Sequence, residues 1–145
     1  MKLKIAWIGK SKDPAINSLA GDYLQRLSHY AAVETLESAS EAALLKQLQK
    51  SGRAPALLVL LEQRGRQLSS EELADFLEQH QTRGTQALAF AIGPADGFKD
   101  AARSAAATII SFGRITLPHE LARVVLLEQL YRAFTILKGH PYHRK

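Results

Sequence analysis

Two groups of residues near the end of the chain have side chains that could bind a charged ligand or assist a reaction. Residues 140–145, with the sequence HPYHRK, place two histidines, a proline and a tyrosine beside two cations. His119 and Arg123 are four residues apart, so they share one face if they lie on a helix. Clustered cations favour a polyanionic partner such as RNA. A basic end that only improves solubility would have the same composition.

The positive charge of the chain is concentrated at this end. Residues 1–113 hold 13 Lys and Arg against 12 Asp and Glu, whereas residues 114–145 hold six against two. The last fifth of the sequence therefore supplies most of the net charge of +5. This distribution favours an RNA-binding surface formed by the C-terminal residues.

Composition excludes several other classes of function. The chain has no cysteine, so disulfides and thiol chemistry are absent. The histidines are not grouped with acids, so no metal is expected, and a lone histidine is more often a structural hydrogen-bonding residue. No apolar run approaches the roughly 20 residues of a membrane span, and residues 1–5 do not resemble a signal peptide. We expect one cytoplasmic domain over residues 1–145.

Three glycine-containing loops are the best candidates for a ligand site. Each follows a short apolar run that is typical of a strand buried on both faces, ending at Leu61, Ile92 and Phe112. Ligands of open parallel sheets bind beyond the carboxyl ends of the strands, and glycine lets the backbone approach a ligand closely. None of the loops matches a nucleotide-binding fingerprint, and no G-x-S-x-G elbow is present. A doubly wound nucleotide-binding protein is therefore only a second alternative.

The elements that must position these loops alternate between strand and helix. Apolar patterns predict strands at residues 3–8, 33–37, 56–61, 87–92 and 108–112, and helices at 14–29, 42–50, 70–81, 99–107 and 118–138. Residues 51–55 and 82–85 read as breaks, and residues 62–68 as a polar loop. Such alternation predicts a mostly parallel α/β sheet flanked by helices.

Capping patterns predict where three of the helices begin. Asp13 precedes a proline, which suits the first position of a helix. Ser38 with Glu41, and Ser69 with Glu72, have the spacing of capping boxes.

The last predicted helix is apolar on more than one side. His119 and Arg123 lie at the N-terminal end of a stripe that continues through Leu126, Leu130 and Phe134. Two interpretations remain open. Arg123 could be paired to a carboxylate in a helix buried against a neighbour, or the helix could contact its own sheet and a second subunit. In the second case its N-terminus would face an anionic site.

The C-terminal sequence closely resembles that of a known enzyme family. The run L-P-H-E-L-A-R-V-V-L-L-E-Q-L-Y-R-A, followed by H-P-Y-H, is similar to the end of the bacterial large-subunit ribosomal RNA pseudouridine-N3 methyltransferases. These are SPOUT, or α/β-knot, methyltransferases. The likeness extends over nearly the whole chain, through Gly9-Lys10, Leu60-Leu61-Glu62, Gly65 and the pattern from Phe90 to Gly97.

This resemblance implies a homodimer, a C-terminal trefoil knot and S-adenosylmethionine as the methyl donor. It also implies a pseudouridine of large-subunit ribosomal RNA, in the assembled ribosome, as substrate. The three loops would hold the donor mainly through their backbone. The positions that match the family's donor contacts are Leu61, Gly93, Phe112, Gly113, Arg114, Ile115, Thr116 and Leu117.

The resemblance also suggests a role for the tail. We expect residues 140–145 to form an ordered lid that completes the substrate pocket, either of the same protomer or across a dimer interface. Tyr142 would stack on or flank the target base, Arg144 would hold phosphate, and Arg123 would orient the tail or the RNA. His143 or His119 would help to remove the N3 proton.

One position departs from the family pattern. The family usually has two adjacent glycines where this chain has Gly93-Pro94, and proline removes an N–H and fixes φ. This is the feature that favours the alternative function, a non-catalytic ribosome- or RNA-binding protein of the same fold.

Overall fold

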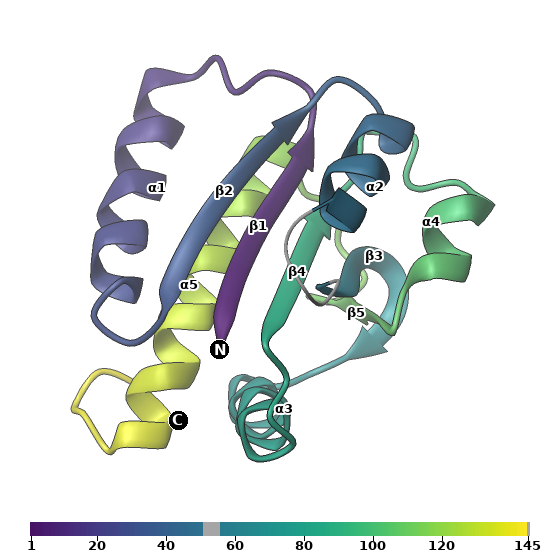
Figure 1. The fold of residues 1–145 in the computed structure, drawn as a ribbon. Helices are drawn as coiled ribbons and strands as arrows, with labels where there is room; N and C mark the ends of the chain where they lie inside the picture. Colours follow the sequence, from purple (N-terminus) through teal and green to yellow (C-terminus); the bar gives the residue numbers. More distant parts are fainter. Residues whose placement is uncertain (51–55, 145) are drawn as a thin grey trace.

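The computed structural model describes residues 1–50 and 56–144. Their strands form one five-stranded sheet with the order β2-β1-β4-β3-β5, in which every neighbouring pair is parallel (Figure 1). The strands are β1 (Lys2–Ile8), β2 (Ala32–Ser38), β3 (Leu57–Gln67), β4 (Ala87–Ile92) and β5 (Thr108–Ser111). The predicted parallel α/β architecture is confirmed. The predicted break at residues 51–55 lies outside the described residues.

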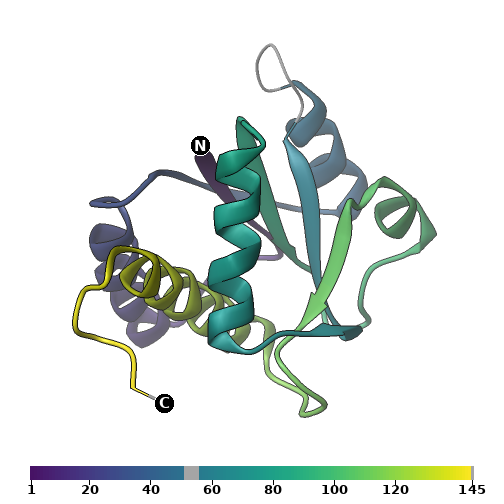
Figure 2. The same cartoon turned by 90° about the horizontal axis from the view of Figure 1, so that it is seen from below.

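Helices cover both faces of the sheet. On one face lie α1 (Pro14–Leu27), α3 (Ser70–Thr82) and α5 (His119–Lys138), which share a single apolar core (Figure 2). On the other face lie α2 (Glu41–Lys50) and α4 (Asp100–Ala105), which pack on a second, smaller core. No helix within the described ranges is long and apolar enough to cross a membrane.

The central strands show why their sequences are continuously apolar. In β4, Leu88 and Phe90 enter the core beneath α5, while Ala89 and Ala91 enter the core beneath α2 and α4. All four side chains are fully buried. Burial on both faces is the usual condition of a parallel strand between two helical layers.

Two of the three predicted caps are present. The Asp13 carboxylate accepts a hydrogen bond from the Ala15 N–H, and Ser69 and Glu72 form the reciprocal capping box at α3. The box predicted for Ser38 and Glu41 is wrong. Ser38 ends β2 and its hydroxyl donates to Gln47, while Ser40 accepts a hydrogen bond from the Ala43 N–H at the start of α2.

The polar loop predicted at residues 62–68 is also wrong, because β3 continues to Gln67. Leu61 and Arg66 both pair with Ile110, so residues 62–65 bulge outward between two segments that pair with the same neighbouring strand. Gly65 lies against the β5 backbone, where a Cβ would be 2.7 Å from the carbonyl carbon of Ile110. Only glycine fits this close crossing of two chain segments.

Candidate functional site

A cavity of about 920 Å³ lies beyond the carboxyl ends of β3, β4 and β5. Its walls come from the bulge after Leu61, the loop from Ile92 to Phe98, and the segment from Ser111 to the first turn of α5. The volume is that of a small-molecule site, and the position is the one predicted from the parallel topology.

Most of the residues predicted to bind a cofactor line this cavity. They are Leu61, Gly93, Phe112, Gly113, Ile115, Thr116 and Leu117. Arg114 does not line it, and its carbonyl instead accepts a hydrogen bond from the Gln63 side chain. Sequence positions that are 56 residues apart, from Leu61 to Leu117, are therefore brought to one hollow.

The loop between β4 and α4 depends on two glycines for different reasons. A Cβ at Gly93 would lie 3.1 Å from the ring of Phe98, which is buried. Gly97 has φ of 82°, and its N–H donates to the carbonyl of Pro94 over 2.8 Å. Pro94 thus occupies the first position of a closed turn. Its carbonyl accepts the hydrogen bond that closes the turn, and this bond needs no N–H from Pro94.

Glu62 is a cavity residue that the sequence pattern did not identify. Its side chain is only 11% exposed and forms an ion pair with Arg103, with Arg103 Nε 3.1 Å from Oε2 and NH2 3.1 Å from Oε1. Oε1 also accepts a hydrogen bond from the Phe98 N–H at 3.2 Å. The Glu62 carboxylate raises the pKa of Arg103. The available signals were its position directly after the buried run of β3 and its place in the Leu60-Leu61-Glu62 match to the family.

Ser111, at the end of β5, connects two of the cavity loops. Its buried hydroxyl accepts the Gly113 N–H at 3.0 Å and lies 3.1 Å from the carbonyl oxygen of Gln63. Gly113 has φ of 115°, a conformation that a β-branched or bulky residue would resist. The Ser111 contacts hold the β3 bulge and the β5–α5 segment next to each other.

His119 lines the cavity from the first turn of α5. A Cβ at Gly9 would lie 3.9 Å from its Nε2, so the end of β1 also approaches the imidazole. The next residue, Glu120, accepts a hydrogen bond from the Lys12 N–H at 2.7 Å and ties the β1–α1 loop to α5. Within the described residues, no group of three His, Asp or Glu could hold a metal ion.

Arg123 is one turn further along α5 and does not line this cavity. It is 5% exposed, with its guanidinium 4.4 Å from the centre of the Trp7 ring. One terminal nitrogen donates to Ser11 Oγ at 2.7 Å and to Asn17 Oδ1 at 2.9 Å. Burial lowers the pKa of Arg123. Among the residues it describes, the structure places no carboxylate within ion-pair distance of Arg123, so the first of the two interpretations, in which Arg123 is paired to a carboxylate, is wrong.

Within residues 140–144, Tyr142 and His143 pack on the C-terminal half of α5. Tyr142 meets Tyr131 edge-on, with ring centres 4.7 Å apart, and lies under the guanidinium of Arg132. His143 is hydrogen-bonded to Arg132 at 3.1 Å and to Glu71 at 2.6 Å, and this bond lowers the pKa of Glu71. Burial, followed by a hydrogen bond with Tyr23, raises the pKa of Tyr142 to about 12.

The predicted catalytic residues therefore fall into three places. His119 lies at the cavity, whereas Tyr142 and His143 contact α5 near Arg132 and Arg144 is exposed. At about 1.5 Å per residue, thirteen residues of α5 separate the levels of His119 and Arg132 by roughly 20 Å. Arg123 is buried beside Trp7 and contacts neither group. Within one chain, none of residues 140–144 lines the cavity.

Comparison with known proteins gives a consistent result. Residues 1–143 match the family model described as "Predicted SPOUT methyltransferase". A protein of Koribacter versatilis is 57% identical over 143 residues, covering 99% of this chain and 98% of that protein. One from Geotalea daltonii is 42% identical over 156 residues, with 99% of both covered. Both are named ribosomal RNA large subunit methyltransferase H.

Solved structures share the fold at low sequence identity. A probable methylase family protein from Haemophilus influenzae has a TM-score of 0.60 and 13% identity, covering 99% of this chain and 70% of its own. The SpoU methyltransferase AviRb from Streptomyces viridochromogenes, in complex with AdoMet, has a TM-score of 0.53 and 15% identity, covering 91% and 57%.

Proposed function

The chain belongs to the SPOUT methyltransferase family, and from this premise we propose that it methylates N3 of a pseudouridine in large-subunit ribosomal RNA, with S-adenosylmethionine as donor. The observation that carries the proposal is the cavity, because its three loops come from the positions that match the family's donor contacts. The names of the relatives support the RNA substrate. We place the reaction in the cytoplasm, on the assembled ribosome.

The residues of the cavity suit this donor. Leu61, Ile92, Phe112 and Leu117 provide apolar walls for an adenine ring, and the loop backbones provide hydrogen-bonding groups. The charge of Arg103, which lines the cavity, is compensated by its ion pair with Glu62. When bound, S-adenosylmethionine supplies an electrophilic methyl group on a sulfonium. The protein's part is to fix the base in line with that group.

His119 is the side chain best placed to take the proton from N3. It lines the cavity at the N-terminus of α5, where the unpaired N–H groups of the helix also favour an anionic base. The methyl group is then transferred to N3, and the donor sulfur keeps the electron pair of the broken bond. Positioning contributes more than proton removal in this scheme, because the sulfonium is a strong leaving group.

We propose further that the chain acts as a homodimer in which each tail completes the partner's cavity. The separation between His119 and the tail within one protomer supports this arrangement. Leu19 on α1 and Leu121 on α5 are 44% and 39% exposed, which suits a surface covered by a second copy. In the dimer Tyr142 would meet the base, and Arg144 would meet the phosphates. The trefoil knot of the family is part of the same proposal.

The test compares the full chain with a form that ends at Gly139. Both are incubated with labelled S-adenosylmethionine and ribosomes from cells that lack this modification. Label in large-subunit RNA from the full chain alone, with equal donor affinity of both forms, would support the enzyme and the role of the tail. Label from both would make the tail dispensable.

The same experiment decides the alternative, a non-catalytic ribosome-binding protein. That function predicts no affinity for the donor or its demethylated product and no label from either form. Pro94 was the feature in its favour, but it occupies a turn that its carbonyl closes.

A further inference from the structure

Glu62 occupies a position from which one carboxylate can control the shape of the donor loop. It is the first residue of the β3 bulge, and its side chain crosses to the loop after β4. Both carboxylate oxygens are committed, Oε1 to Phe98 N–H and Arg103, and Oε2 to Arg103. Only 11% of the side chain is exposed, so water hydrates this carboxylate poorly. Without those partners its charge would be buried and unpaired, which is unfavourable.

A chain of contacts leads from Glu62 through Phe98 to Gly93, which lines the cavity. The Phe98 N–H that Glu62 accepts fixes the backbone of a buried residue, 3% exposed. The Phe98 ring in turn packs so closely on Gly93 that a Cβ there would lie 3.1 Å away. Gly97 packs on the carboxylate itself, since its Cβ would be 3.7 Å from Oε1. Glu62 therefore holds the Phe98 end of the turn directly, and the Phe98 ring carries this contact on to Gly93.

We propose that Glu62 is a positioning residue of the donor site, which keeps the loop from Gly93 to Phe98 in the donor-binding conformation through Phe98, with Arg103 as its counter-ion. The inference rests on the proposed function, because it takes the donor to be S-adenosylmethionine. Glu62 does not act on the reacting atoms, since its oxygens face Arg103 and the loop backbone. Arg103 comes from α4, so this small helix becomes part of the donor site.

The neighbouring carboxylates differ from Glu62 in ways that make them useful controls. Glu41 accepts the Lys99 N–H at 2.7 Å, one residue beyond Phe98, but does not line the cavity. Asp100 is fully exposed and only 3.9 Å from Arg103. If donor affinity depended only on negative charge near α4, Asp100→Asn would also weaken donor binding. If it depends on the loop conformation that Glu62 holds, Asp100→Asn should leave donor affinity unchanged.

The experiment measures the affinity of purified full-length variants for S-adenosylmethionine and its demethylated product by calorimetry, and then the kinetics on ribosomes. Glu62→Ala removes the acceptor of the Phe98 N–H and the partner of Arg103. A charge-assisted hydrogen bond of this kind corresponds to a loss of affinity of about ten- to a hundredfold. Glu62→Gln keeps an oxygen for Phe98, so it should recover part of that loss. Asp100→Asn should bind as the wild type does.

The kinetic results separate positioning from other roles. We expect a raised KM for the donor in Glu62→Gln and Arg103→Ala, with kcat at saturating donor and KM for ribosomes unchanged. Wild-type affinity in both Glu62 variants would overturn the inference. A fall in kcat at saturating donor with unchanged affinity would also overturn it, because Glu62 would then act in the chemistry. If the wild type itself binds no donor, the proposed function fails instead.

Discussion

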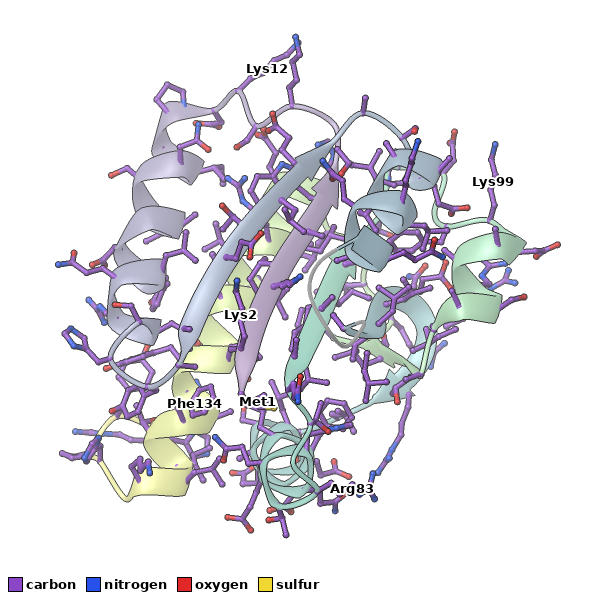
Figure 3. The ribbon with its side chains drawn as sticks, viewed as in Figure 1. Met1, Lys2, Lys12, Arg83, Lys99 and Phe134 are labelled. Carbon is purple, nitrogen blue, oxygen red and sulfur yellow. The ribbon has the colours of Figure 1, made fainter. Side chains whose placement is uncertain are left out.

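At the scale of single residues, the loops along the carboxyl edge of the sheet are held by glutamates that accept hydrogen bonds from backbone N–H groups. Glu37 accepts from Ser11, Glu41 from Lys99, Glu62 from Phe98 and Glu120 from Lys12. The side chains of Lys12 and Lys99 project into solvent along this edge (Figure 3). Each bond fixes a loop without regular structure, and each joins residues from 26 to 108 positions apart.

These bonds explain why sequence patterns located the loops but not their supports. Periodicity showed where the buried apolar runs of β3, β4 and β5 end, because apolar runs depend on local burial, but it did not show that β3 continues to Gln67. The partner of a carboxylate depends on tertiary packing, so Glu62 and Glu120 looked like ordinary surface acids. Arg123 was placed correctly on the buried side of α5, but its partners, Trp7, Ser11 and Asn17, could not be identified from spacing.

Arg123 should contribute to stability more than to substrate binding. Arg123→Ala removes two hydrogen bonds and the contact with Trp7, so we expect the free energy of unfolding to fall by about 2–4 kcal/mol. Urea denaturation measures this loss. Arg123→Lys should recover only part of it, because an ammonium lacks the planar group that stacks on the indole. Unchanged stability of Arg123→Ala, with weakened binding of ribosomes, would instead support the RNA-orienting role.

The tail should make stability depend on pH at the alkaline end. The pKa of Tyr142 is raised to about 12 by burial, from an ordinary value near 10. The folded state therefore disfavours the phenolate, so the neutral Tyr142 side chain contributes to the free energy of unfolding. This contribution is complete below pH about 10 and is lost as the pH rises from there toward 12. Tyr142→Phe should lose less stability over that interval. Ultraviolet titration of tyrosinate should show that the substitution removes an ionisation near pH 12, and an unchanged titration curve would contradict the assignment.

At the scale of elements, prediction succeeded where a pattern is local. Asp13 and Ser69 cap their helices as expected, because the cap and its N–H partner lie within three residues. The cap predicted at Ser38 was wrong because Ser38 is the last residue of β2. Ser40, which is equally suitable as a cap, accepts the hydrogen bond at the start of α2 instead. The prediction missed the extension of β3 because residues 62–67 are polar. Their pairing with β5 depends on a strand about 45 residues away, which a local pattern does not show.

The crossing of β3 over β5 should tolerate no side chain at Gly65. In Gly65→Ala the new Cβ would meet backbone atoms of Ile109 and Ile110 at 2.7–2.8 Å. Neither strand can move without breaking the sheet, so we expect a loss of at least about 1–3 kcal/mol, or failure to fold. Gly21→Ala is the matched control, because no atom lies within 4 Å of its Cβ and α1 should gain about 0.5–1 kcal/mol. Thermal denaturation of both variants tests the crossing, which would be refuted by equal stabilities.

At the scale of the whole molecule, the arrangement divides the proposed active site between the two ends of α5. His119 and the donor cavity lie at its N-terminus, and the tail packs beside Arg132. The sequence indicated both His119 with the donor loops and the tail as candidate site residues, but not the distance between them. The length and direction of α5 determine that distance. A second protomer is then the simplest way to bring a tail to a cavity.

Mixing two inactive variants should therefore restore activity. One variant carries Thr116→Trp, which places a bulky side chain at an exposed position of the donor cavity and leaves the tail intact, and the other ends at Gly139 and keeps an open cavity. If the tail acts across the interface, each mixed dimer has one complete site. Random exchange of equal amounts should then give about a quarter of wild-type methylation of ribosomes. A tail that acts on its own protomer's cavity would leave every mixed dimer inactive. Labelled S-adenosylmethionine measures the result, and mass spectrometry of the intact dimers confirms that exchange has occurred.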